Sequence, residues 1–129
     1  CENGQAVAEF LASHPKIAYV NYCGLPGDKY HAVAEKYLPN GSCGVVSFGV
    51  KGGREAAAAF MGHLKIAAIE THVADARTCC LHPASSTHRQ MNDEQLIAAG
   101  VQPDLVRMSC GLEDKNDLIH DIAQALDQI

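Results

Sequence analysis

Residues 105–110 have the sequence LVRMSC, and this short stretch sets the fold class. Side chains on a β-strand point alternately to its two faces, so the stretch separates into two sets. One face would carry Val106, Met108 and Cys110, and the other Leu105, Arg107 and Ser109. The first set is apolar and the second contains a charge. The stretch therefore predicts a strand that helices cover on one side only.

Further strands are predicted on both sides of this stretch along the chain, with helices between them. The predicted strands are IAYVNY (17–22), GVVSFGV (44–50) and CCL (79–81). Helical patterns occupy about 6–13, 28–38, 53–64, 92–100 and 114–129. Asp28 is placed to cap the second helix, and Asn92 with Gln95 forms a capping-box pattern ahead of the fourth, which Gly100 ends. The alternation predicts one α/β domain in which helices pack on a small sheet.

Composition excludes several classes of protein. The chain has 129 residues and a net charge of −5, with lysines and arginines scattered singly. No basic stripe suggests a nucleic-acid partner, and no apolar run reaches the roughly 20 residues that span a bilayer. A soluble, cytoplasmic protein without a nucleic-acid or membrane partner is expected. The helical pattern at Ala6–Leu11 begins without a preceding turn, which predicts that the chain is a piece of a longer protein.

Six cysteines stand at positions 1, 23, 43, 79, 80 and 110, without any Cys-x-x-Cys pair. The spacing is not that of a disulfide framework, so buried free thiols are expected. A zinc site would have to combine residues such as Cys79, Cys80, His82 and His88. Adjacent cysteines on a strand point to opposite faces, so no metal site is expected. The loop HPASSTHRQ (82–90) is interpreted instead as the edge of a site completed elsewhere.

Arg107 is the most informative single residue of the predicted sheet. One interpretation is a charge on a solvated face. The other is an anion clamp, because a guanidinium held on a rigid strand can bind a carboxylate with two parallel hydrogen bonds. The residues alone leave both interpretations open.

Several motifs occur together in one order. These are CENGQAVAEFLASHPK (1–16), VSFGVKGGREAAAAF (46–60), DARTCCLHPASSTHRQ (75–90), EQLIAAGVQPDLVRMSCGLED (94–114) and DLIHDIAQAL (117–126). They resemble the C-terminal region of the Cys/Met-metabolism family of pyridoxal-phosphate (PLP) enzymes. The resemblance is greatest to members that exchange the acetyl group of O-acetyl-L-homoserine for sulfide.

The resemblance implies a fold and a domain arrangement. Residues 1–129 would be the small C-terminal, substrate-binding domain of a fold type I (aspartate aminotransferase-like) enzyme, with a mainly antiparallel sheet. Residues 1–13 would belong to the helix that leads into it. A large PLP-binding domain would lie outside this chain, and the whole protein would be a homotetramer.

The resemblance also implies an activity and a site. The whole enzyme would convert O-acetylhomoserine and sulfide, or a thiol, into homocysteine and acetate in methionine biosynthesis. Arg107 would bind the substrate α-carboxylate, with Thr78 beside it and Thr87 approaching from the 82–90 loop. The chain would supply no catalytic, cofactor-binding or metal-binding residue. None of its lysines, at 16, 29, 36, 51, 65 and 115, stands in the family's S-x-T-K context, so the chain alone is expected to be inactive.

Departures from the family pattern leave alternatives. A common pattern has glycine before the aspartate of GDAKS, whereas this chain has Ala74-Asp75 and then Arg77-Thr78. The segment IAAIETHVAD (66–75) differs from the form usual in the lyases, which favours a sulfhydrylase. Cystathionine γ-synthase, cystathionine γ-lyase and methionine γ-lyase remain alternatives within the family. A free-standing, non-catalytic ligand-binding α/β module is an alternative outside it.

Overall fold

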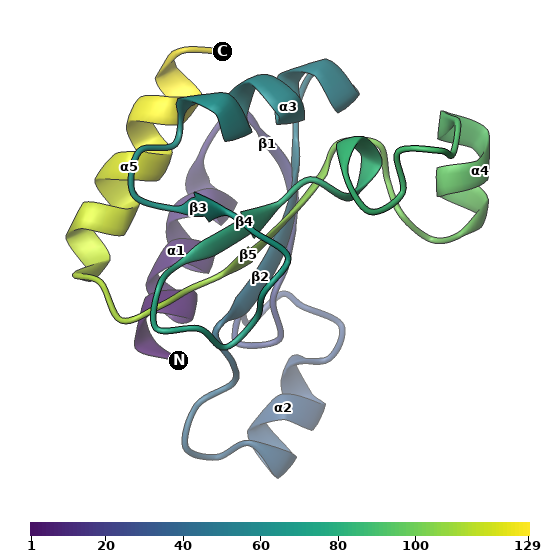
Figure 1. The fold of residues 1–129 in the computed structure, drawn as a ribbon. Coiled ribbons are helices and arrows are strands. Elements are labelled where there is room, and N and C mark those ends of the chain that lie inside the picture. Colours follow the sequence, from purple (N-terminus) through teal and green to yellow (C-terminus); the bar gives the residue numbers. More distant parts are fainter.

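Five strands form one sheet in the order β1-β2-β5-β4-β3, and the computed structural model describes all of residues 1–129 (Figure 1). In chain order the elements are α1 (Glu2–Ser13), β1 (Ile17–Asn21), α2 (His31–Tyr37), β2 (Val45–Val50), α3 (Gly53–His63), β3 (Ala68–Ile69), β4 (Cys79–Leu81), the 3-10 turn η1 (Pro83–Ser85), α4 (Asp93–Ala98), β5 (Leu105–Ser109) and α5 (Lys115–Asp127).

The sheet is mainly antiparallel, as expected. β5 pairs with β2 on one side, from Val45↔Ser109 to Gly49↔Leu105, and with β4 on the other, from Cys79↔Ser109 to Leu81↔Arg107. β1 runs antiparallel to β2, and only the short β3 runs parallel, beside β4. The stretch 105–109 therefore lies at the centre of the sheet, where its register is fixed from both sides.

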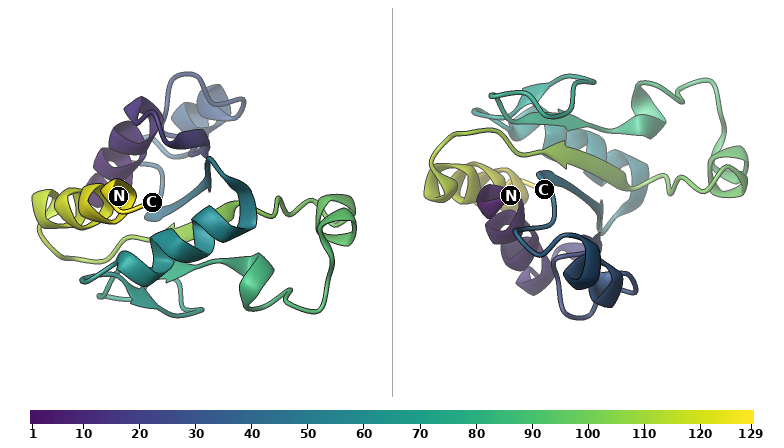
Figure 2. Two further views of the ribbon diagram at one scale, coloured as in Figure 1. Left: turned by 90° about the horizontal axis from the view of Figure 1, so that it is seen from above. Right: turned by 90° about the horizontal axis from the view of Figure 1, so that it is seen from below.

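Helices α1, α3 and α5 pack on one face of this sheet, and α1 and α5 lie side by side (Figure 2). The side chains that face them form a single apolar core. It consists chiefly of Val7, Leu11, Val46, Phe48, Val50, Phe60, Cys80, Val106, Met108, Leu118, Ile122 and Leu126. Val106 and Met108 are completely buried, whereas Arg107 between them points to the other face. The predicted alternation is confirmed, and helices cover only the face of Val106 and Met108. The other face is not bare, because Ser109, Cys79 and Leu81 on the side of Arg107 are also buried.

Two helices stand outside this packing. α2 and α4 project from the sheet in different directions (Figure 1). α2 exposes large apolar side chains: Tyr30, Val33, Tyr37 and Leu38 are each between 45% and 66% exposed. None of the helices combines the length and apolar character that crossing a membrane requires.

Local signals in the sequence located most elements, with informative differences. The capping box of α4 is present, and Gly100 with φ of +80° follows the helix end. Asp28 does not cap α2, which begins at His31. Its carboxylate instead accepts the backbone amides of Tyr22 and Tyr30, at 3.2 and 2.8 Å, and so shapes the turn before the helix. β3 was not predicted, because a two-residue strand exists only through its pairing with β4.

The cysteines differ in part from the expectation of buried thiols. All six are free, but only Cys79 and Cys80 are buried. Cys1 is exposed, and Cys23, Cys43 and Cys110 are half-buried. The three half-buried thiols lie just outside strands: Cys23 follows β1, Cys43 precedes β2 and Cys110 follows β5.

Candidate functional site

Arg107 lies in the middle of the uncovered sheet face. In the strand register its neighbours are Ser47 of β2 and Leu81 of β4. Residues directly opposite in antiparallel strands project to the same side, so both neighbours share its face. A guanidinium in this position is carried by the best-anchored strand of the sheet, which suits it to hold a ligand in a defined orientation.

The guanidinium group of Arg107 is only partly used by the protein. Its Nη2 donates to the backbone carbonyl of Thr71 at 2.7 Å. Its Nε is buried and has no hydrogen-bond partner, and it is the sole buried side-chain nitrogen or oxygen in that condition. An unpaired buried donor costs about 1–3 kcal/mol. The guanidinium therefore keeps an unpaired donor, and a carboxylate has the two acceptor oxygens that suit such a fork.

The segment 70–77 lies beside Arg107 and supplies the carbonyl that it contacts. The backbone amide of Ala74 donates to the Ser109 hydroxyl at 3.0 Å, which attaches this exposed segment to β5. Ala74 has a φ of +58°, the left-handed conformation that glycine adopts without strain. This accounts for the glycine that the family pattern has at that position. The sequence carried no signal that the Thr71 carbonyl would meet Arg107.

Thr78 is buried at the start of β4 and takes part in a closed set of hydrogen bonds. Its hydroxyl donates to Glu113 Oε2 at 2.7 Å and accepts the Gly111 amide at 2.8 Å. Cys79 and Leu81 lie on the face of Arg107, so strand alternation places Thr78 toward the other face. The structure does not bring the Thr78 hydroxyl to Arg107. It assigns this residue to the junction between β4 and the segment that follows β5.

Glu113 completes this junction, and the sequence analysis did not single it out. Its Oε1 accepts the Thr78 amide at 2.7 Å. Burial opposes ionisation of Glu113, but the hydrogen bonds from the Thr78 amide and hydroxyl outweigh it and lower the carboxyl pKa below its ordinary value. Gly111 is required nearby, because a Cβ there would lie 2.3 Å from the Ala76 carbonyl oxygen.

Thr87 lies on the exposed part of the 82–90 loop. Its hydroxyl is 2.9 Å from His88 Nδ1, and no hydrogen bond connects it with Arg107. His82 at the start of the loop is buried, with Nδ1 2.9 Å from the Ser85 hydroxyl and Nε2 2.8 Å from the Pro103 carbonyl. Both of its ring nitrogens are occupied, so His82 fixes the loop and has no free lone pair for a metal.

Arg54 of α3 connects this loop with α4. Its Nη1 donates to the Ala84 carbonyl at 2.6 Å, and its Nε donates to Asp93 Oδ1 at 3.0 Å. Asp93 is the first residue of α4. One side chain from the body of the domain therefore holds both η1 and the projecting helix.

The thiols beside the strand do not offer a nucleophile. Cys79 lies on the face of Arg107 and Cys80 in the core, and both are buried. Burial raises the pKa of each thiol, so both remain protonated at neutral pH. What this face supplies is a cation held on a strand with an unpaired donor, the chemistry that suits binding of an anion.

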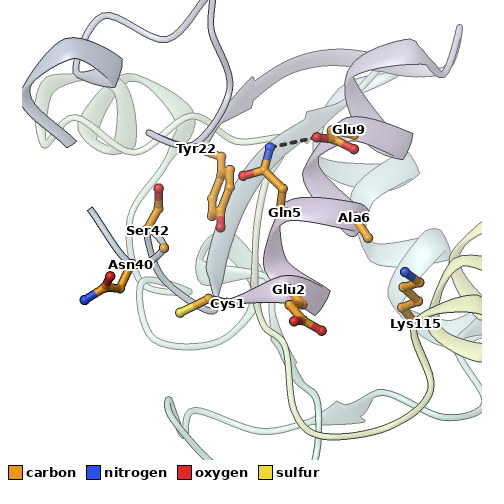
Figure 3. A pocket seen from close by; sticks show the side chains of 10 residues that line it. Cys1, Glu2, Gln5, Ala6, Glu9, Tyr22, Asn40, Ser42 and Lys115 are labelled. Atoms are coloured by element: carbon orange, nitrogen blue, oxygen red, sulfur yellow. Dashed lines mark hydrogen bonds between the residues drawn. The ribbon is translucent and has the colours of Figure 1, made fainter. Parts of the chain in front are cut away.

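The largest hollow, of about 380 Å³, lies elsewhere. Figure 3 shows it against α1, with Gln5, Tyr22 and Ser42 around it and Lys115 on the far side. Neither this hollow nor the next, of about 330 Å³, includes Arg107. No helix covers the Arg107 face and neither hollow reaches it, so a ligand held at the guanidinium would need a second surface to enclose it.

Residues 1–127 match the family described as Cys/Met metabolism PLP-dependent enzymes. The chain belongs to this family. Among curated relatives, it is 44% identical to O-acetyl-L-homoserine sulfhydrylase of Leptospira meyeri, covering 98% of this chain and 29% of that protein. It is 44% identical to homocysteine synthase of Schizosaccharomyces pombe, with the same two coverages. It is 40% identical to L-methionine gamma-lyase of Fusobacterium nucleatum subsp. polymorphum, covering 100% and 32%.

A solved structure shares the fold. It is a Campylobacter jejuni protein described as an O-acetylhomoserine (thiol)-lyase, with a TM-score of 0.88 and 37% identity over 98% of this chain and 30% of that one. That protein carries N'-pyridoxyl-lysine-5'-monophosphate. The chain thus spans about 30% of the length of the relatives it matches.

The enzymes of this family depend on PLP, and the lysines of this chain do not form a cradle for it. Lys16 Nζ donates to the carbonyls of Leu126 and Ile129 at the end of α5, both at 2.7 Å. Lys29 and Lys36 lie over the rings of the tyrosines that follow them. Lys51, Lys65 and Lys115 are exposed. Cofactor binding by another region of the protein is consistent with this arrangement.

Proposed function

We propose that residues 1–129 are the C-terminal, substrate-binding domain of a PLP-dependent O-acetyl-L-homoserine sulfhydrylase. The whole enzyme would convert O-acetylhomoserine and sulfide into homocysteine and acetate. The observation that carries the proposal is the buried, unpartnered Nε of Arg107 on the uncovered face of the central strand. The names of the most similar relatives support this activity over others in the family.

In this proposal Arg107 binds the α-carboxylate of the substrate. The free Nε and the neighbouring guanidinium nitrogens present paired donors, which fix the plane of the carboxylate as well as its position. Holding the amino acid by this group orients the carbon chain that reacts. The cofactor, when bound by the rest of the enzyme, supplies the electron sink for the reaction.

The two threonines have different parts in the proposal. Thr78 acts through the frame of the site, because its hydroxyl is committed to Glu113 and Gly111. Thr87 is exposed on the 82–90 loop, so its hydroxyl can line the edge of a site that a second surface closes. That second surface would be a large PLP-binding domain. By resemblance to the family, we also propose a homotetramer that acts in the cytoplasm.

A γ-elimination enzyme is the second candidate, because methionine gamma-lyases are 40% identical over the whole chain. Cystathionine γ-synthase and γ-lyase share the same family framework. The products distinguish these activities: a sulfhydrylase forms homocysteine and acetate from O-acetylhomoserine and sulfide, whereas a methionine γ-lyase forms a 2-oxo acid, ammonia and methanethiol from methionine and water. A free-standing, non-catalytic ligand-binding module would form neither.

The test is steady-state kinetics of Arg107→Lys and Arg107→Ala in the full-length protein. Lysine keeps the charge but lacks the paired donors of the guanidinium. We therefore expect kcat/KM to fall by the equivalent of roughly 1–3 kcal/mol of transition-state stabilisation, mostly through a higher KM for O-acetylhomoserine. Alanine should cause a larger loss. Cofactor content and absorbance should remain normal. The control is Lys51→Ala, an exposed cation outside the 82–90 loop, which should behave as wild type. Wild-type kcat/KM in Arg107→Ala would refute the site.

A further inference from the structure

The chain between β1 and β2, residues 22–44, carries α2 and forms an excursion from the sheet. Cys23 and Cys43 lie at its two ends. β1 ends at Asn21 and β2 begins at Val45, and the register Asn21↔Ser47 brings these ends together. The Tyr22 hydroxyl donates to the Cys43 carbonyl at 2.8 Å. A Cβ added at Gly24 would lie 3.1 Å from the Ser42 hydroxyl, and Figure 3 shows Ser42 close to Tyr22. The segments 22–24 and 42–43 are therefore adjacent where the excursion leaves the sheet, and together they form its neck.

Cys23 and Cys43 belong to these two adjacent segments. The Cys43 thiol donates to the Val45 carbonyl at 3.3 Å. Both residues are half-buried and free. Burial raises the pKa of Cys43, which keeps it as a protonated thiol until a partner draws it into reaction.

Cys23 is the accessible member of the pair. It lines a hollow of about 330 Å³ together with His31 and Glu35 of α2. His31 Nδ1 lies 2.8 Å from the Cys23 carbonyl oxygen, and Nε2 lies 3.4 Å from Glu35 Oε1. These contacts place the ring of His31 against the backbone of Cys23.

We propose that Cys23 and Cys43 form a peroxide-sensitive dithiol that closes the neck of the α2 excursion. The Cys23 thiolate attacks one oxygen of hydrogen peroxide, the O–O bond breaks, and a sulfenic acid and hydroxide form. The Cys43 sulfur then attacks the Cys23 sulfur, an S–S bond replaces the S–O bond, and water leaves. In sum, two thiols and one peroxide give one disulfide and two waters.

The other cysteines are less suited to this reaction. Cys79 and Cys80 are buried in the sheet, and Cys1 is exposed without a neighbouring thiol that any contact identifies. Cys110 is the rival partner for Cys43, because its amide bonds to the Gly44 carbonyl at 2.7 Å and places it on the other side of β2. Burial raises the pKa of Cys110 to about 12, and no histidine contacts it. A Cys43–Cys110 link is therefore the specific alternative.

A Cys23–Cys43 bond would change how α2 is held. Residues 24–42 would become a covalently closed loop, which restricts separation of α2 from the sheet. This loop carries the exposed apolar side chains Tyr30, Val33, Tyr37 and Leu38. The modification would thus act on the position of an exposed surface and leave Arg107, on the uncovered sheet face, untouched.

The test is peroxide treatment of the full-length protein, followed by thiol alkylation and peptide mass spectrometry. We expect a peptide pair joined through Cys23 and Cys43 that dithiothreitol releases. In Cys43→Ser, oxidation should stop at a Cys23 sulfenic acid, which dimedone traps. The matched control Cys110→Ser should form the same link as wild type.

Three results would overturn the proposal. One is a Cys43–Cys110 link in place of the expected pair. Another is oxidation of Cys23 to a sulfinic acid while Cys43 remains open to alkylation. The third is an unmodified Cys23 under conditions that oxidise Cys1. None of these readouts depends on the proposed sulfhydrylase activity, so the two proposals fail separately.

Discussion

The Glu113 carboxylate accepts both the backbone amide and the hydroxyl of Thr78, each at 2.7 Å. The same hydroxyl accepts the Gly111 amide at 2.8 Å, which closes a ring of hydrogen bonds between the start of β4 and the segment after β5. The ring fixes the end of the strand on which Arg107 stands. It also fixes the end of segment 70–77, whose Thr71 carbonyl Arg107 contacts.

Replacing Glu113 by glutamine should destabilise the chain. Glutamine has one acceptor oxygen, so it can keep the amide or the hydroxyl of Thr78 but not both, and it lacks the charge that strengthens these bonds. We expect a loss of roughly 1–2 kcal/mol in the free energy of unfolding, measured by urea denaturation. The control Glu55→Gln, at an exposed position of α3, should stay within about 0.5 kcal/mol of wild type. Equal stability of the two variants would contradict the role of the ring.

The same carboxylate should make stability depend on pH. The pKa of Glu113 in the folded chain is lower than in the unfolded chain, where it is about 4.3. Its stabilising contribution is therefore complete above that unfolded value and is lost as the pH falls through the lower, folded value. The stability gap between wild type and Glu113→Gln should be constant near neutral pH and narrow below about pH 4. Parallel stability curves down to pH 3 would rule this out.

Asp121 of α5 should be essential to the fold. Its buried carboxylate accepts three successive backbone amides, from Lys65, Ile66 and Ala67, at 2.8, 2.9 and 3.1 Å. In Asp121→Asn the side-chain amide nitrogen must face at least one of these backbone donors. We therefore expect the free energy of unfolding to fall by roughly 2–3 kcal/mol. The matched control is Asp117→Asn, one turn earlier and exposed, with little effect. Thermal or urea unfolding checks this, and similar midpoints for both variants would refute it.

Ala74→Gly should stabilise the chain, in contrast to most glycine substitutions. The alanine is held at a φ of +58°, where its Cβ is unfavourable, and glycine removes that strain at the cost of a more flexible unfolded chain. We expect the free energy of unfolding, measured by urea denaturation, to rise by about 0.5–1 kcal/mol. The control Ala76→Gly lies two residues away, has no positive φ, and should be neutral or destabilising. A loss of stability in Ala74→Gly would show that the segment adopts another conformation.

Some of the site could be foreseen from single residues. Arg107 was identified because a charge at an alternating position of a central strand must leave the core. Asp121 could have been found in the same way, since it lies between Leu118 and Ile122 on the buried stripe of α5. Glu113 and the Thr71 carbonyl had no such signal. Thr78 was placed beside the substrate carboxylate by resemblance, and that placement stays a prediction; its hydroxyl is bonded to Glu113 and Gly111.

The sequence by itself determined what depends on short-range order along the chain. The alternation in LVRMSC set the exposed face of Arg107, the Asn92–Gln95 pair set the start of α4, and the apolar stripes set the helix faces that form the core. The tertiary structure decided which polar groups meet across long separations: Arg107 with the Thr71 carbonyl, and Asp121 with the amides of 65–67. The physical reason is that backbone amides and carbonyls are the same at every residue. Only the path of the folded chain can therefore select which of them a distant side chain will bind.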